Sequence, residues 1–304
     1  LPKMKTYENY DLKNHTTSKI SSFAKVVYIP ESKEEFVDLL KTFDTPPVII
    51  GGGSNVLLSS HGIDTPVILT TNLRNITVNN NTIKAQCGVK TGVLSKTAAD
   101  NNLSGMEFLF VIPATVGGVV KMNSSAHSQS IKDILISAEV FDMTQKKVLN
   151  LSNDELELSY RTSILQKKPL ILLEAVFNLE KQNKELIDKR MQENLDYRKE
   201  KQPALTEPNF GSTFRNPQGA AVGKMIEELG LKGTVEGGAK ISEIHGNFIV
   251  NYSKQATSTD VLRLMFKMYN AVKQKFGYEI KTEVIFIGNM TEEEKKIWTL
   301  IKSH

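Results

Sequence analysis

The chain has 304 residues, 40% of them apolar and 24% charged, which is typical of a globular protein of about two domains. Its net charge of +4 is too small, and its lysines too scattered, to indicate nucleic acid; an anionic small molecule suits it better. The single cysteine, Cys87, excludes an intrachain disulfide and a thiolate metal site. Residues 1–15 lack the apolar segment of a signal peptide, and no apolar run approaches the ~20 residues of a membrane span. We therefore expect a cytoplasmic monomer without metal, nucleic-acid or membrane partners.

The first predicted unit is a strand at 26–29, a helix that begins after Ser32, a strand at 48–50 and a glycine turn. Consecutive glycines can bring backbone N–H groups against a ligand, and phosphate is the leading candidate. The glycines could equally serve a tight crossing between strands. The residues of this turn are Gly51, Gly52, Gly53, Ser54 and Asn55.

A second turn of small residues follows a strand at 67–69, a hairpin across 76–85 with an asparagine turn, and a helix between Lys90 and Asn102. It offers backbone N–H groups and short side chains beside a fixed proline bend. Taken alone, it is better explained as a buried helix start with glycine packing. Its candidate ligand-binding residues are Pro113, Thr115, Gly117, Gly118 and Asn123.

Arg161 lies among hydroxyl groups between a strand at 134–141 and an apolar strand at 170–177 that we expect to be buried on both faces. Such an arginine could fork onto a carboxylate, or it could be one exposed surface residue. A charged amphipathic helix at 184–201 then ends before the prolines of 203–208, where we place the main domain boundary.

The second domain opens with a loop that brings together Ser212, an arginine and the Asn216-Pro dipeptide. His245, before a strand at 248–250, could be catalytic or, as is more common for a lone histidine, structural. A helix capped by Thr257 follows, and Glu283 is expected inside a final strand at 282–287. Residues 289–304 predict a short helix that packs on its own body.

The order of these motifs resembles the bacterial UDP-N-acetylenolpyruvoylglucosamine reductase family, over about residues 5–288. The motifs are Gly-Gly-Gly-Ser-Asn, Ile-Pro-x-Thr-Val-Gly-Gly, Ser-Tyr-Arg-x-Ser, Gly-Ser-x-Phe-x-Asn-Pro and a terminal glutamate. The resemblance implies an α+β fold, with an FAD-binding region of two α+β subdomains and a smaller α/β substrate-binding domain. It sets the FAD-binding region at 1–205, divided into 1–74 and 75–205, the substrate domain at 206–288 and a helical tail at 289–304.

The resemblance also implies a reaction, in which NADPH reduces FAD and hydride then passes to the enolpyruvyl group of a UDP-sugar, giving UDP-N-acetylmuramate for peptidoglycan. The glycine turn at 51–55 and the segment from Pro113 to Asn123 would hold FAD. Arg161 would pair with the substrate carboxylate and the developing enolate, Glu283 would stabilise the same enol form, and Ser212 would donate the proton.

Several positions depart from the family pattern and concern FAD contacts more than the chemistry. Ala114 replaces a common Gly, Ser124-Ser125 replaces Ala-Gly, and 18–24 lacks a Gly-Gly pair. No inserted tyrosine loop interrupts 177–201, which indicates the shorter of the family's two types. Diphosphate contacts would then come from elsewhere, with Asn216, Arg198 and Lys201 as candidates. Two alternatives stay open: an FAD-dependent oxidase of the same FAD-binding class, and a non-catalytic nucleotide-binding protein.

Overall fold

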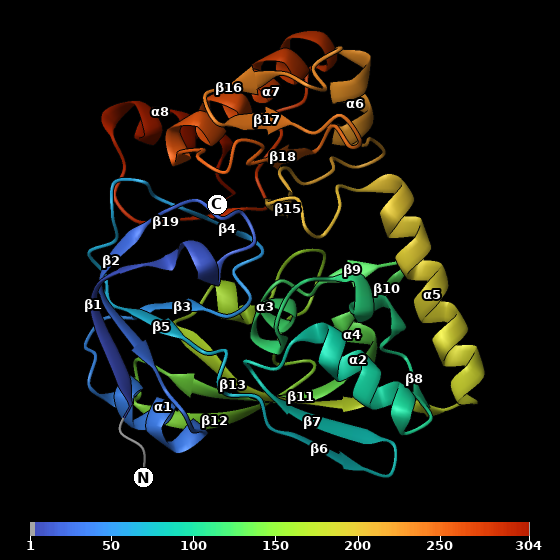
Figure 1. Cartoon of the computed structure of the whole chain (residues 1–304). Coiled ribbons are helices and arrows are strands. Elements are labelled where there is room, and N and C mark those ends of the chain that lie inside the picture. Colours follow the sequence, from blue (N-terminus) through green and yellow to red (C-terminus); the bar gives the residue numbers. More distant parts are fainter. Residues whose placement is uncertain (1–3, 304) are drawn as a thin grey trace. The chain divides into compact units, whose positions relative to one another are not determined.

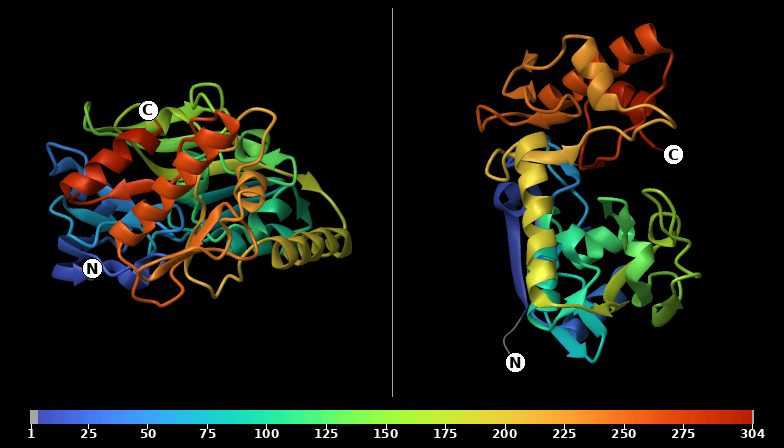
Figure 2. Two further views of the ribbon diagram at one scale, coloured as in Figure 1. Left: turned by 90° about the horizontal axis from the view of Figure 1, so that it is seen from above. Right: turned by 90° about the vertical axis from the view of Figure 1, so that its right-hand side faces the viewer.

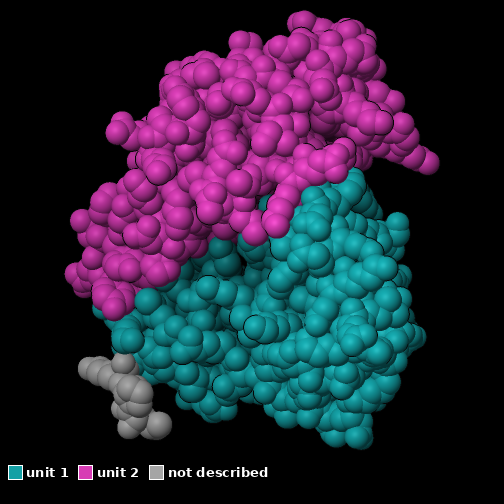
Figure 3. Space-filling model, turned by 45° about the vertical axis from the view of Figure 1, so that its right-hand side comes forward, with its two compact units in different colours: residues 1–6, 28–52, 67–198 teal, residues 7–27, 53–66, 199–304 magenta. Residues whose placement is uncertain are grey.

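The computed structural model describes residues 4–303 and divides into two compact units (Figure 3). Unit 1 comprises residues 1–6, 28–52 and 67–198, and unit 2 comprises 7–27, 53–66 and 199–304. The last crossing, at 198/199, lies near the expected boundary at 205/206. Residues 7–27 and 53–66 were expected with the FAD-binding region but cluster with the C-terminal residues. These two units are defined by contacts within the chain. The limits expected for the FAD-binding region, the substrate domain and the tail stay a prediction.

Unit 1 is built on a five-stranded antiparallel sheet with the order β12-β11-β13-β7-β6. Figure 1 shows α2 and α3 on one face of this sheet. The elements of unit 1 are α1 (Lys33–Lys41), β3 (Val48–Ile50), β5 (Val67–Leu69), β6 (Ile76–Asn79), β7 (Thr82–Gln86), α2 (Thr91–Asp100), β8 (Leu103–Ser104), a 3₁₀ turn (Glu107–Val111), α3 (Val116–Lys121), β9 (Ser125–Ala126), β10 (Gln129–Ser130), α4 (Ile131–Ile134), β11 (Leu135–Asp142), β12 (Lys147–Ser152), a 3₁₀ turn (Ile164–Gln166), β13 (Leu170–Asn178) and β14 (Glu180–Lys181).

The sheet of unit 1 forms where the apolar patterns predict it. Strand β13 is buried along nearly its whole length, as its unbroken apolar run indicates, and it pairs with β11 on one side and β7 on the other. The β6–β7 hairpin turns at Asn80, whose φ of 52° confirms the predicted left-handed asparagine. Apolar residues of α1, α2, α3 and these strands form one core that fixes the ends of α3.

Unit 2 contains a four-stranded antiparallel sheet with the order β15-β18-β17-β16 and a separate parallel pair, β4 with β19. Helix α7 lies along β16 and β17 (Figures 1 and 2). The elements of unit 2 are a 3₁₀ turn (Leu12–His15), β4 (Val56–Leu58), β15 (Asn209–Ser212), α6 (Val222–Glu228), β16 (Val235–Glu236), β17 (Ala239–Ile241), β18 (Phe248–Val250), α7 (Ser258–Phe276), β19 (Ile285–Ile287) and α8 (Glu292–Ile301).

Three of the five points where the chain passes between the units lie inside a strand or a helix. Strands β1 (Lys5–Asp11) and β2 (Phe23–Ile29) belong to a sheet with the order β1-β2-β5-β3, and helix α5 spans Lys184–Lys201. The mixed helices and strands of both units confirm the α+β class. Among the described residues, no helix has the length and apolar character needed to cross a membrane.

The C-terminal tail forms the predicted helix, α8. Thr291 caps it, accepting from the Glu294 backbone while the Glu294 carboxylate accepts from the Thr291 backbone. Ile297 and Ile301 are buried in the core of unit 2, which confirms that the tail packs on its own body. The prediction for Glu283 was wrong in one respect: β19 begins at Ile285, so Glu283 lies in the extended segment just before the strand.

Candidate active site

The first part of the glycine turn lies against the proline turn within unit 1. A Cβ on Gly51 would lie 2.1 Å from Thr115 Oγ1, and a Cβ on Gly52 would lie 3.2 Å from the Ala114 Cα. The absence of side chains therefore lets the two predicted FAD-binding segments approach each other. Close packing of these glycines is compatible with ligand binding, because both require backbone without a side chain.

Thr115, at the start of α3, has a hydroxyl group with no hydrogen-bond partner among residues 4–303. Its side chain is 1% exposed, and no described atom is placed to hydrogen-bond its Oγ1. It is the N-cap residue of α3, yet its hydroxyl makes no capping bond. Because an unsatisfied buried hydroxyl costs about 1–3 kcal/mol, a bound polar group is the natural partner for this atom.

Gly117 and Gly118 serve different purposes at the start of α3. The Gly117 N–H donates to the Cys87 carbonyl (2.8 Å), and a Cβ at Gly117 would lie 3.2 Å from that oxygen. Gly117 therefore packs against the backbone of Cys87, as the packing interpretation predicts. A Cβ at Gly118 would meet no atom within 4 Å, so Gly118 faces open space. Of the two, Gly118 is the one whose surroundings leave room for a ligand.

The remainder of the glycine turn belongs to unit 2. Gly53 has a φ of +61°, and a Cβ there would lie 2.2 Å from the His15 carbonyl oxygen, so only glycine fits. The Gly53 carbonyl accepts from the Thr17 N–H (3.1 Å), and the Ser54 carbonyl lies beside Gly211. Asn55 Nδ2 donates to the Glu283 carbonyl oxygen (3.0 Å). The glycine turn thus contacts the segments that hold Ser212 and Glu283.

Ser212 and Glu283 are held together through one backbone carbonyl. Ser212 ends β15 and pairs with Phe248, while the next residue, Thr213, accepts at its carbonyl oxygen from the Glu283 N–H (3.1 Å). The same oxygen accepts from Thr282 Oγ1 (2.7 Å), a contact that the sequence did not indicate. Both Ser212 and Glu283 are partly exposed, so their side chains are accessible to a small molecule.

Arg161 lies in unit 1, in a tight turn next to the end of α3. Its φ of +53° is unusual for a residue with a side chain and costs on the order of 1 kcal/mol or more, which marks the turn as a candidate functional position. Its guanidinium donates from Nη1 to Ser125 Oγ (3.1 Å) and lies 5.5 Å from the Tyr160 ring centre. Asn123 holds the turn by donating from Nδ2 to the Ser159 carbonyl (2.9 Å). The structure therefore unites Arg161 with Asn123.

Ser125 is a site residue that the sequence reasoning missed, although Ser124-Ser125 had been noted as a departure from the family pattern. For the reduction that the family resemblance implies, we expect Ser125→Ala to lower kcat/KM roughly three- to tenfold, because a hydrogen bond to a charged group contributes about 1.5–3 kcal/mol before solvent screening. Steady-state kinetics with varied substrate measure this. Ser124→Ala is the matched control, and equal activities in the two variants would contradict a positioning role for Ser125.

The three residues expected to contact the substrate diphosphate differ in their burial and in their hydrogen-bond partners. The Asn216 Oδ1 accepts from the Val222 N–H (3.0 Å), so its amide oxygen caps α6 and its Nδ2 is what it could offer a ligand. Lys201 is exposed and pairs with Glu200 (2.5 Å). Arg198 on α5 is more buried, and burial lowers the pKa of its guanidinium. Their roles stay predictions.

His245 is held as a neutral ring by its neighbours. Its Nδ1 accepts from the Asn247 N–H (3.1 Å), its ring packs edge-on against Phe248, and Gly223 leaves the space it fills. Burial lowers its pKa, with Lys232 adding to this effect, while a hydrogen bond with its own backbone and the charge of Glu227 oppose it. These contacts describe a structural histidine.

The histidine gives a pH prediction for stability. Because the folded pKa lies below the ordinary value of 6.5, its contribution is complete above that pH and is lost as pH falls through the folded pKa. We expect the melting temperature of the wild type to fall more steeply than that of His245→Gln as the pH is lowered below 6.5. Differential scanning fluorimetry at several pH values measures this, and parallel curves would contradict it.

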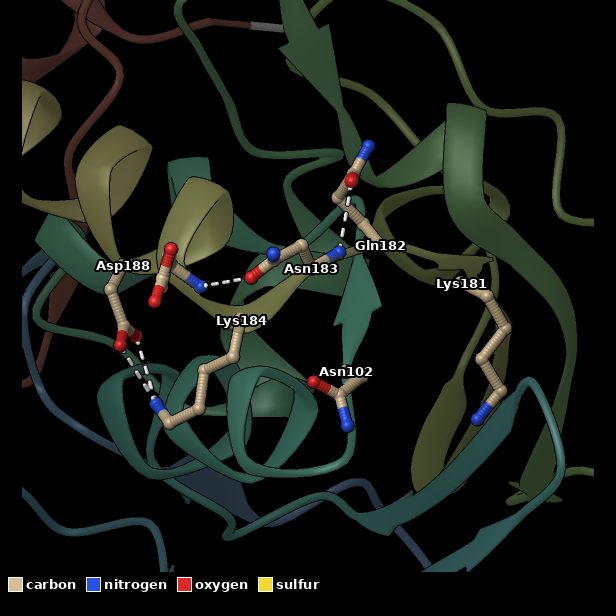
Figure 4. Close-up of a pocket in the computed structure, with 7 residues that line it drawn as sticks. Asn102, Lys181, Gln182, Asn183, Lys184 and Asp188 are labelled. Atoms are coloured by element: carbon tan, nitrogen blue, oxygen red, sulfur yellow. Dashed lines mark hydrogen bonds and ion pairs between the residues drawn. The ribbon is translucent and has the colours of Figure 1, made fainter.

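A recess on the surface of unit 1 carries none of the predicted site residues. It lies at the start of α5, where Lys184 Nζ binds both oxygens of Asp188 and the Glu185 N–H donates to Asn183 Oδ1 (Figure 4). Several of its polar groups are thus paired with one another. Between residues 4 and 303, no cluster of three or more histidine, cysteine, aspartate or glutamate side chains is placed to hold a metal.

Comparison with known proteins agrees with this geometry. The family model "FAD binding domain" matches residues 24–152, and the model "UDP-N-acetylenolpyruvoylglucosamine reductase, C-terminal domain" matches 202–287. The UDP-N-acetylenolpyruvoylglucosamine reductase of Caldanaerobacter subterraneus is 42% identical over 93% of this chain and 94% of its own length, and that of Bacillus subtilis is 40% identical over the same shares. The crystal structure of UDP-N-acetylenolpyruvylglucosamine reductase from Thermus caldophilus superposes with a TM-score of 0.80 at 32% identity, covering 94% of this chain and 99% of that one. The chain belongs to the UDP-N-acetylenolpyruvoylglucosamine reductase family.

Proposed function

We propose that this protein is an FAD-dependent oxidoreductase that uses NADPH to reduce the enolpyruvyl group of UDP-N-acetylglucosamine enolpyruvate to UDP-N-acetylmuramate, a step of peptidoglycan synthesis. Membership of the family supports the reaction. The observation that supports the assignment of residues is the backbone bond from the Glu283 N–H to the carbonyl of Thr213, the residue directly after Ser212, which joins the two segments that hold the expected proton donor and carboxylate.

The residues of the two turns fit FAD. Gly51, Gly52 and Gly118 present backbone without side chains, and Thr115 has a buried hydroxyl that awaits a partner. Such bare backbone with a nearby hydroxyl suits the oxygens of a pyrophosphate. FAD, when bound, supplies the carrier that accepts hydride from NADPH and delivers it to the substrate double bond.

The chemistry left to the protein is to stabilise charge and to deliver a proton. Addition of hydride to the vinyl carbon leaves negative charge on the adjacent carbon and on its carboxylate. Arg161 pairs with that carboxylate, and Glu283 stabilises the enol form. Ser212 donates its hydroxyl proton to the adjacent carbon, a step open to a weak acid because the enolate is strongly basic. Asn216, Arg198 and Lys201 are proposed to contact the diphosphate.

The purified protein tests the class of reaction. We expect an absorption band of oxidised flavin, retained or restored by added FAD, that NADPH bleaches. Protein that neither contains flavin nor takes it up would overturn the proposal and would favour a non-catalytic nucleotide-binding protein. Rapid turnover with oxygen in place of the UDP-sugar would instead favour an oxidase of the same FAD-binding class.

The remaining partners and the location are also proposals. The family relation supports a UDP-sugar and NADPH as the small-molecule partners. A monomeric state, a cytoplasmic location and the lack of nucleic-acid or membrane partners stay predictions. Light scattering coupled to gel filtration tests the first of them, and a dimer mass would contradict it.

A further inference from the structure

We propose that Thr282 is a positioning residue that holds Ser212 and Glu283 in register, and that the C-terminal helix α8 fixes Thr282 from its other side. This inference rests on the proposed roles of Ser212 and Glu283. Thr282 directly precedes Glu283 and is 2% exposed, and its side chain has no direct access to a substrate. It therefore acts through its neighbours.

The Thr282 hydroxyl joins two segments of unit 2 that are far apart in the sequence. Its Oγ1 donates to the Thr213 carbonyl (2.7 Å) and accepts from the Val284 N–H (3.0 Å). The first bond fixes the residue after Ser212, and the second fixes the residue after Glu283. A single hydroxyl thus sets the position of both candidate catalytic residues.

The backbone of Thr282 is anchored to the tail. Its N–H donates to the Ile301 carbonyl (2.8 Å), and its carbonyl accepts from Ser303 Oγ (2.7 Å). All three polar atoms of this buried residue are consequently bonded, and its hydroxyl makes two bonds. Since Ile301 and Ser303 lie beyond residue 287, where the family model ends, these two bonds belong to the additional C-terminal segment.

Helix α8 is held in unit 2 by hydrogen bonds and by apolar packing. Glu294, 0% exposed, accepts at Oε1 from the Ser258 and Thr259 hydroxyls at the start of α7 (2.9 Å each). Ile297 and Ile301 are buried in the core with α7. The tail therefore contacts α7 at one end and Thr282 at the other, and so links the two.

Asn247 also contacts the two residues that follow Ser212. Its Oδ1 accepts from the Phe214 N–H (3.0 Å), its Nδ2 donates to the Phe214 carbonyl (2.8 Å), and its own carbonyl accepts from the Thr213 N–H (2.8 Å). Residues 213 and 214 are therefore held both by Thr282 and by Asn247. Removing the Thr282 hydroxyl should therefore shift this segment and Glu283 relative to each other without unfolding the segment.

The test compares Thr282→Val, which keeps the shape and removes the hydroxyl, with Thr282→Ser, which keeps the hydroxyl. We expect Thr282→Val to lower the rate of substrate reduction about tenfold or more while NADPH bleaches the bound flavin at the wild-type rate. Thr282→Ser should recover most of the loss. Ser303→Ala removes only the bond to the Thr282 carbonyl, and we expect it to slow substrate reduction by a smaller factor, about two- to fivefold.

Thr299→Val is the matched control in the tail, because it removes a hydroxyl that donates to the Lys295 carbonyl (2.8 Å) within α8. It should leave both half-reactions unchanged. Equal slowing of both half-reactions in Thr282→Val, failure of Thr282→Ser to recover activity, or, if Thr282→Val does not fold, wild-type substrate reduction in Ser303→Ala would overturn the inference. Ser212→Ala, assayed in parallel, separates the two levels: wild-type activity there defeats the proposed function, whereas loss there with full activity in Thr282→Val defeats only the role of Thr282.

Discussion

Ser212→Ala is expected to leave reduction of the bound flavin by NADPH at the wild-type rate and to slow substrate reduction by at least ~100-fold, the usual scale of general acid catalysis. The reason is that the role proposed for Ser212 comes only after hydride has been delivered, when the carbon next to the carboxylate needs a proton. Anaerobic stopped-flow absorbance measures the two half-reactions separately.

The comparison with Ser212→Cys sharpens this prediction. A thiol is a stronger acid than a serine hydroxyl and is of similar size, so Ser212→Cys should retain far more substrate reduction than Ser212→Ala. Both variants should bind substrate. A uniform loss of both half-reactions in Ser212→Ala would assign the serine a structural role at the end of β15 instead.

Gly118→Ala is expected to weaken FAD binding about tenfold or more, which is about 1.4 kcal/mol, while the protein without FAD becomes more stable or stays unchanged. The added methyl group meets no protein atom within 4 Å, and alanine is a better helix former than glycine by ~1 kcal/mol. Opposite effects on stability and on affinity would show that the open space beside α3 belongs to the cofactor. Fluorescence titration of the FAD-free protein and its melting temperature measure the two quantities.

Gly92→Ala is the matched control for this substitution. Gly92 lies in the first turn of α2, and a Cβ there would meet its nearest atom only at 4.0 Å. We expect the same gain in helix stability with unchanged FAD affinity. Loss of FAD affinity in both variants, or in neither, would contradict the placement of FAD beside Gly118.

The sequence predicted the local elements well, because their causes are local. The apolar run of β13, the asparagine turn at Asn80, the cap of α7 and the helix α8 each depend on a few adjacent residues. The motifs also indicated the candidate site residues. The motifs did not indicate which other residues these site residues contact.

The remaining features depend on pairing between distant segments. Strand β4, directly after the glycine turn, pairs in parallel with β19, and this places residues 53–66 with the C-terminal part of the chain. The contact of Asn55 with Glu283 spans 228 positions. No periodicity within a short window encodes such a pairing. The same holds for Thr282, whose importance depends on where Thr213 and Ile301 lie.

The start of β19 shows a further limit. The apolar run after Thr282 predicts a strand from that residue onward, but the Thr282 hydroxyl accepts from the Val284 N–H and the Glu283 N–H donates to Thr213. The backbone here forms an isolated antiparallel bridge between Thr282 and Phe214, and pairing with β4 begins at Ile285. A side-chain hydrogen bond of this kind competes with the sheet ladder, and it occurs at the candidate catalytic residue.

The central claim is that this protein delivers hydride from NADPH to an enolpyruvyl UDP-sugar with FAD as carrier. The most direct test mixes the NADPH-treated protein with UDP-N-acetylglucosamine enolpyruvate without oxygen and follows the flavin absorption and the product mass. We predict that the oxidised flavin band returns in a single turnover and that one equivalent of UDP-N-acetylmuramate appears. A band that stays bleached with that substrate, or returns without formation of the reduced sugar, would contradict the account.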